Sequence, residues 1–180
     1  LSLILRNGDI IEELRDEVQS FNYDLTIIGG SGKRSMAHDL VQYIDSSIFV
    51  VNNFNRKQTY RILLAVDDSE GNKKAVKFAV RVAQAFNIEV DIVSITNEKR
   101  VSEKFHSYSH RAEKMMRRTG VKSKVRFVKG DLVDTLLDVA GNNHIIVMGR
   151  SSQSPLSKFF LGSKPLAVME SCNCPMVIVK

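Results

Sequence analysis

Short apolar runs alternate with amphipathic stretches through residues 59–180. The apolar runs lie at residues 61–66, 90–95, 125–128, 145–148 and 176–179. After the first run, apolar positions recur three and four residues apart over 75–83, which is typical of a helix that buries one face. Further helices are indicated at 101–119, which Gly120 would end, at 132–140 and at 165–171.

Strands that alternate with helices pair in parallel, because each helix carries the chain back along a face of the sheet. The pattern therefore predicts an α/β fold with a doubly wound, parallel, five-stranded sheet in residues 59–180.

Residues 1–51 repeat the second half of this pattern. The matching segments are 3–9 with 125–131, 25–29 with 145–149, and 47–51 with 175–179. Roughly 60 residues, which hold the first two strands of the complete copy, have no counterpart in the first. We therefore predict the second half of a degenerate domain at 1–51, a linker at 52–58 and a complete domain at 59–180. We expect residues 1–51 to depend for stability on an upstream segment, on the complete domain or on another chain.

The composition fits a globular protein, because 43% of the residues are hydrophobic. No apolar run approaches the roughly 18 residues of a membrane-spanning helix, so we expect no membrane insertion of this segment. The start lacks the basic region of a signal peptide, and its apolar run without Met suggests a fragment or an internal start. Cys172 and Cys174 form neither a disulfide framework nor a zinc motif, which favours a reducing, cytoplasmic setting.

The net charge of +6 is concentrated between residues 99 and 129. A nucleic-acid surface would interleave aromatic stacking platforms with this charge, but Phe105, Tyr108 and Phe127 occupy positions typical of a core-facing stripe. We therefore interpret the basic stretch as a solvated helix face and expect no nucleic-acid partner. His106 and His110 share a helix face without a third ligand, so we expect no metal site.

Candidate chemistry lies where the first and fourth strands of the complete domain end. Asp67 follows the first strand and Gly149 ends the fourth, and such strand ends flank the crevice in which open α/β sheets bind ligands. A carboxylate repels phosphate but accepts a hydrogen bond from an adenine amino group or a ribose hydroxyl. Gly162 and Ser163, before a helix that Pro165 opens, would offer backbone N–H groups and a hydroxyl to an anion. Taken alone, such a loop equally fits turn glycines and a capping serine.

Several segments of the complete domain match one family pattern. They are 62–69, the Gly130-Asp131 pair, 146–149, 160–163 and 174–179. In combination they resemble the universal stress protein family, over essentially all of residues 59–180 and again, for the second half, over 1–51. The resemblance implies an adenine-nucleotide α-hydrolase-like fold.

In nucleotide-binding members of that family, a G-x2-G-x9-G-(S/T) loop holds the ribose and phosphates, and an Asp after the first strand meets adenine. The resemblance therefore implies a nucleotide site made of Asp67 against adenine, Ala65, Val66 and Ile95 lining its pocket, Met148 and Gly149 beside the ribose and phosphates, and Ser152, Gly162, Ser163 and Lys164 around the phosphates. Solvent exposure is an equally good interpretation of Lys164. Ser152 stands where the family has its second glycine, and serine resists positive φ by roughly 1 kcal/mol, which argues against tight ATP binding.

The first copy departs further from the family pattern. Its phosphate loop is shorter, and Arg34-Ser35 takes the place of Gly162-Ser163. The glycine-rich segment 29–32 is therefore interpreted as part of a degenerate pairing partner rather than as a second nucleotide site.

The resemblance favours a stress-response regulatory module that binds ATP or another adenine nucleotide, with or without Mg²⁺, and is at most a slow ATPase. The alternative is a nucleotide-free dimerisation or regulatory module. Either kind of module could be the cytosolic tail of a membrane transporter. An adenylating enzyme fits less well, because residues 68–71 poorly match the phosphate loop of that class. Members of the family often pair through the last strand, so the resemblance implies a homodimer or an intrachain pseudo-dimer in which residues 48–51 and 176–179 meet.

Overall fold

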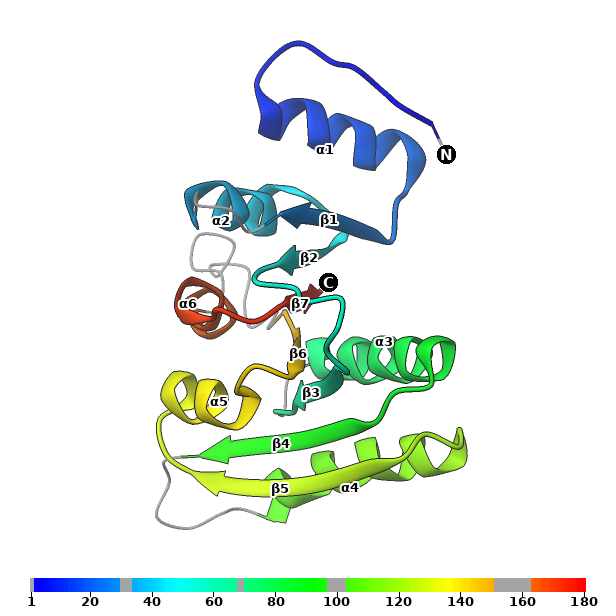
Figure 1. Cartoon of the computed structure of the whole chain (residues 1–180), viewed down its shortest axis with the longest axis vertical. Coiled ribbons are helices and arrows are strands. Elements are labelled where there is room, and N and C mark those ends of the chain that lie inside the picture. Colours follow the sequence, from blue (N-terminus) through cyan, green and yellow to red (C-terminus); the bar gives the residue numbers. More distant parts are fainter. Residues whose placement is uncertain (1, 30–33, 68–69, 97–102, 151–162) are drawn as a thin grey trace.

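The computed structural model describes residues 2–29, 34–67, 70–96, 103–150 and 163–180 (Figure 1). The helices are α1 (Ile10–Phe21), α2 (Arg34–Tyr43), α3 (Glu70–Phe86), α4 (Glu103–Arg118), α5 (Leu132–Ala140) and α6 (Ser163–Ser171). The strands are β1 (Leu25–Gly29), β2 (Ser47–Val51), β3 (Arg61–Ala65), β4 (Val90–Thr96), β5 (Ser123–Lys129), β6 (His144–Gly149) and β7 (Met176–Val179). Every element predicted within residues 59–180 is present, with small differences at the ends.

The described strands form one seven-stranded sheet in the order β1-β2-β7-β6-β3-β4-β5. Neighbouring strands are parallel except β2 and β7, which are antiparallel with Phe49 opposite Val177. The sheet has seven strands, where five were expected for the complete domain, because β1 and β2 extend it through this antiparallel pair. The two segments expected to meet in a pseudo-dimer thus pair within one chain.

Helices lie on both faces of the sheet (Figure 1). On one face α3 packs against β3, β6 and β7, and α4 packs against β4 and β5. On the other face α2 contacts β2, α5 contacts β4 and β6, and α6 lies beside α5. Along β3 the buried side chains of Ile62 and Leu64 join the core under α3, and Leu63 joins the core on the opposite face. Because β3 is covered on both faces, its sequence is a continuous apolar run rather than an alternating one.

The amino-terminal segment matches its expected counterpart only in part. Residues 3–5, which we matched with the strand at 125–128, form no strand, and the Leu3 and Leu5 side chains are 88% exposed. The following Gly-Asp pair does repeat the same local structure. Asp9 caps α1 through hydrogen bonds that its Oδ1 accepts from two backbone N–H groups at 2.9 and 3.1 Å, and Asp131 caps α5 in the same way at 2.8 and 3.2 Å.

Candidate functional site

The carboxyl ends of β3 and β6 lie side by side, as the sequence predicted. The two strands pair in parallel with Leu64 opposite Val147, so Asp67 and Gly149 follow at the same edge of the sheet. The Asp67 side chain is exposed, and its backbone carbonyl accepts a hydrogen bond from Asn72 Nδ2 at 2.9 Å. Asn72 belongs to the first turn of α3, which therefore anchors the chain segment that carries Asp67.

The same helical turn lies against the end of β6. A Cβ atom on Gly149 would sit 2.3 Å from the backbone carbon and oxygen of Gly71 and 2.7 Å from the Asn72 nitrogen. A Cβ atom on Gly71 would sit 2.0 Å from the Arg150 carbonyl oxygen. Two backbones approach this closely only where neither residue carries a side chain. The sequence interpretation missed Gly71 and Asn72, although a glycine in the first turn of a helix was the available signal.

Four other predicted site residues belong to the ends of β3, β4 and β6. Ala65 and Ile95 are half-buried, and both pack against the core on the α5 side of the sheet. Val66 and Met148 are only 4% and 7% exposed, because their side chains belong to the two cores. A ligand at this edge would meet Val66 and Met148 mainly through their backbone atoms.

The predicted phosphate end is described only from Ser163 onward. Helix α6 begins at Ser163, earlier than the Pro165 start that we expected, and the Lys164 side chain is exposed. Because α6 connects the parallel strands β6 and β7, its first turn lies at the edge where β6 ends. Ser152 and Gly162 lie outside the described residues.

The buried side chain of Asn72 bears on whether an organic ligand fits at this edge. Asn72 is 5% exposed, and its Oδ1 has no hydrogen-bond partner within the part of the chain that the structure describes. A buried acceptor without a partner costs about 1–3 kcal/mol. A donor group from a bound molecule would remove that cost, and an adenine amino group is such a donor.

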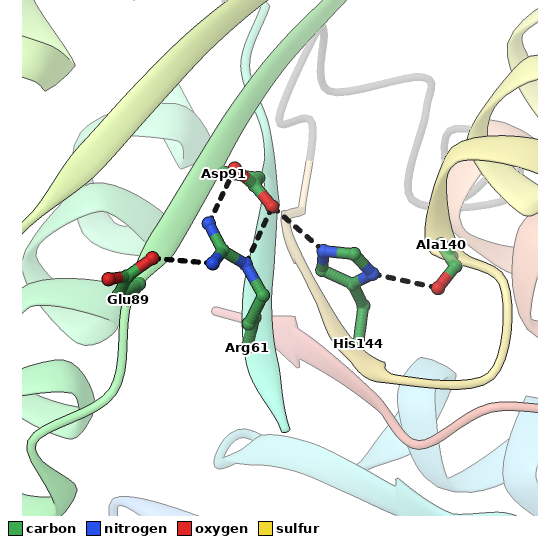
Figure 2. Close-up of polar contacts among 5 residues, drawn as sticks. All are labelled: Arg61, Glu89, Asp91, Ala140 and His144. Carbon is green, nitrogen blue, oxygen red and sulfur yellow. Dashed lines mark hydrogen bonds and ion pairs between the residues drawn. The ribbon is translucent and has the colours of Figure 1, made fainter. Parts of the chain in front are cut away.

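A second polar cluster lies near the opposite, amino-terminal edge of the sheet (Figure 2). The buried Asp91 carboxylate accepts hydrogen bonds from Arg61 Nε and Nη2, both at 2.9 Å, and from His144 Nε2 at 2.9 Å. Arg61 also pairs with Glu89. His144 Nδ1 lies 2.8 Å from the Ala140 carbonyl oxygen, so both ring nitrogens face acceptors, and both hydrogen bonds form only when each nitrogen carries a proton.

The contacts of this cluster hold three strands together. Burial would raise the pKa of Asp91, but hydrogen bonds from Arg61 and His144 outweigh burial and hold that pKa below its ordinary value. The cluster joins β3, β4 and β6 at the edge away from Asp67 and Gly149. The sequence interpretation missed it, although a carboxylate inside the apolar run of β4 was a visible signal.

The other residues that the sequence analysis considered lie away from the edge formed by the ends of β3 and β6, or inside the core. Cys172 and Cys174 are buried free thiols. Phe127, expected in a core-facing stripe, is instead 39% exposed and lies against His106 with 4.4 Å between ring centroids. Tyr108 is half-buried against the core under α3, and the Phe105 side chain is outside the described part.

Neither a metal-ligand cluster nor a membrane-spanning helix is present among the described residues. These residues contain no group of three His, Cys, Asp or Glu side chains arranged to hold a metal ion. Among them, too, no helix has the length and apolar character to cross a membrane.

Comparison with known proteins agrees with this fold. The model of the universal stress protein family matches residues 59–180. A universal stress protein of Methanocaldococcus jannaschii, MJ0531, is 22% identical over 153 residues, which cover 73% of this chain and 90% of the relative. A universal stress protein of Helicobacter pylori is 25% identical over 136 residues, 66% of this chain and 98% of the relative.

Solved structures share the architecture. A universal stress protein from Archaeoglobus fulgidus superposes with a TM-score of 0.72 at 16% identity, over 96% of this chain and 66% of its own. The chain therefore spans about two thirds of the length of that protein. A universal stress protein in complex with cAMP has a TM-score of 0.54 at 22% identity, over 68% of this chain and 98% of its own. With the family model covering more than half of its residues, the chain belongs to the universal stress protein family.

Proposed function

We propose that residues 59–180 bind an adenine nucleotide, ATP or a close relative, at the edge formed by the ends of β3 and β6. The observation that carries this proposal is the placement of Asp67 and Gly149 at one sheet edge, both held by the first turn of α3. An exposed carboxylate there suits the base and ribose of a nucleotide rather than its phosphates. The solved universal stress protein in complex with cAMP supports an adenine nucleotide as the ligand class.

The proposed roles of the residues follow from their positions. Asp67 would accept a hydrogen bond from the adenine amino group or the ribose, with Ala65 and Ile95 against the base. The backbone of Gly149 and the first turn of α6 at Ser163 would face the phosphates, because a helix start offers unpaired N–H groups to an anion. The proposal includes no catalytic residue, so we expect at most slow hydrolysis of ATP.

We further propose that the module is regulatory and that residues 1–51 are a degenerate second half-domain. The register supports the half-domain: Gly29 lies opposite Val51 in the β1–β2 pair, as Gly149 lies opposite Val179 in the β6–β7 pair. The two pairs meet at the antiparallel β2–β7 contact, which supports the proposal of an intrachain pseudo-dimer. Binding of a nucleotide to residues 59–180 would then alter a surface to which residues 1–51 also contribute.

Titration calorimetry with ATP, AMP and cAMP, each with and without Mg²⁺, tests nucleotide binding. We expect saturable binding that Asp67→Ala and Gly162→Val both abolish, while the exposed and distant Tyr43→Ala leaves it unchanged. Asp67→Asn separates the roles of charge and hydrogen bonding, because an amide oxygen still accepts a hydrogen bond. Absence of binding to all three nucleotides would overturn the proposal and favour a nucleotide-free dimerisation module.

A further inference from the structure

We propose that Cys172 and Cys174 form a site of reversible oxidation, at which a small hydroperoxide converts the two thiols into an intramolecular disulfide. They are the only cysteines of the chain, and both are free thiols. They lie in the short connection between α6 and β7 (Figure 1). The proposal does not depend on nucleotide binding.

The side chain of Cys172 is folded against the residue with which it would react. Its Sγ accepts a hydrogen bond from the Cys174 backbone N–H at 3.2 Å and donates one to the Cys174 carbonyl oxygen at 3.3 Å. Cα atoms two residues apart are separated by at most about 7 Å, which is also the upper limit for a disulfide. The attacking and the resolving thiol are therefore held together before any oxidant arrives.

The same contact gives the two thiols different roles. A hydrogen bond from the Cys174 side chain lowers the pKa of Cys172 and outweighs burial, which acts in the opposite direction. That hydrogen bond and burial both raise the pKa of Cys174, so Cys174 keeps its proton. Because the thiolate is the form that attacks a peroxide, Cys172 reacts first and Cys174 resolves the intermediate.

Burial selects a small oxidant. Cys172 and Cys174 are only 5% and 6% exposed, but Ser171 and Asn173, on either side of Cys172, are exposed, so the thiols lie directly beneath the surface. Hydrogen peroxide needs only a slight opening of this connection to reach Sγ. A disulfide reagent or a protein oxidoreductase would have to bring a bulky sulfur substituent to the same atom. We therefore name a small hydroperoxide as the oxidant.

The reaction balances with hydrogen peroxide alone. The Cys172 thiolate attacks one peroxide oxygen, the O–O bond breaks, and the hydroxide that leaves takes up a proton, so that Cys172 becomes a sulfenic acid. The Cys174 sulfur then attacks the Cys172 sulfur, the S–O bond breaks, and a second water leaves with the thiol proton. Two thiols are oxidised to one disulfide, and one peroxide is reduced to two waters.

The disulfide would form where separate parts of the chain are joined. The Cys172 N–H donates a hydrogen bond to the Val168 carbonyl oxygen of α6 at 2.8 Å, and the Cys172 carbonyl oxygen accepts one at 3.3 Å from Nδ2 of Asn52, which follows β2. The disulfide removes the thiol hydrogen bond from Cys172 to Cys174, so the connection that makes these contacts must rearrange.

Mass spectrometry of the full chain after treatment with hydrogen peroxide is the direct test. We expect a loss of two hydrogen atoms, protection of both cysteines from alkylation, and reversal by dithiothreitol. In Cys174→Ser, oxidation should stop at a sulfenic acid on Cys172, which dimedone labels. Cys172→Ser should be labelled at least about tenfold more slowly, because its remaining thiol keeps its proton.

The same two variants in urea are the matched control. They should be labelled at equal rates there, because unfolding removes the contacts that distinguish the two thiols. Circular dichroism establishes that both variants fold without urea, and the wild-type measurement alone decides whether the bridge forms. Full alkylation of both cysteines after peroxide, sulfinic acid without a bridge, or a disulfide between two chains would overturn the proposal. Equal labelling of the two folded variants would overturn the assignment of Cys172 as the attacking thiol.

Discussion

The backbone of Gly71 in the first turn of α3 lies directly against that of Gly149 at the end of β6. The contact leaves no space for a side chain on either residue, since a Cβ atom on Gly149 would lie 2.3 Å from Gly71. It positions the start of α3 between the ends of β3 and β6, where the proposed nucleotide site lies. Gly149, the first glycine of the family's loop pattern, is therefore needed in this structure for the packing of α3 against β6.

Gly149→Ala should lower the free energy of unfolding by about 2–3 kcal/mol, because the helix or the strand must move to accommodate the methyl group. Chemical denaturation measures this loss. Gly29→Ala is the matched control, since Gly29 occupies the corresponding position of β1 and no described atom would lie within 4 Å of an added Cβ, and it should change stability by less than about 0.5 kcal/mol. Equal losses in the two variants would contradict the contact.

Asp91→Asn should destabilise the protein by about 3 kcal/mol, because Arg61 and His144 would lose the carboxylate that both of them face. Urea denaturation at neutral pH is the appropriate measurement. Glu89→Gln provides the comparison: Glu89 pairs with the same arginine, but its side chain is 41% exposed, so its loss should cost no more than about 1 kcal/mol. A larger effect at Glu89 than at Asp91 would show that the buried cluster is not the stabilising element.

The lowered pKa of Asp91 predicts acid sensitivity. A carboxyl group whose pKa is lower in the folded than in the unfolded state adds stability above its unfolded pKa, near about 4, and loses that contribution as the pH falls through the folded value. The stability difference between the wild-type protein and Asp91→Asn should therefore shrink as the pH falls from about 5 towards 2. Melting temperatures across this range measure it, and a constant difference would refute the assignment.

Lys180 predicts a second rise of stability with pH, at alkaline pH. Burial, together with the nearby charge of Arg150, lowers the pKa of Lys180 to about 8, and its Nζ donates a hydrogen bond to the Ile44 carbonyl oxygen. Folding therefore disfavours the protonated amine. The resulting loss of stability is complete below about pH 8 and absent above the ordinary lysine pKa of 10.5. Relative to Lys180→Met, the wild-type protein should gain stability between these pH values. A parallel pH profile for the two proteins would exclude the shift.

Sequence periodicity predicted the elements of residues 59–180 because each follows from a local pattern, such as the apolar run of β3 or the Gly120 end of α4. It failed at residues 3–5, where an apolar run alone does not make a strand without a neighbour to pair with. Asp67 and Gly149 could be assigned to one edge because parallel topology requires it. The roles of Asn72 and His144 could not be predicted. Asn72 bonds to Asp67 across the turn before α3, and His144 bonds to Asp91, which is distant in the sequence.

The amino-acid sequence by itself determined the order of strands and helices in residues 59–180 and the family, because these depend on residue type and spacing along the chain. Only the tertiary structure decided that α3 meets Gly149, that Arg61 and His144 converge on Asp91, and that β2 pairs with β7 and so joins β1 and β2 to the sheet of residues 59–180. Such contacts depend on how closely distant backbones and side chains approach, and spacing along the chain does not specify that distance.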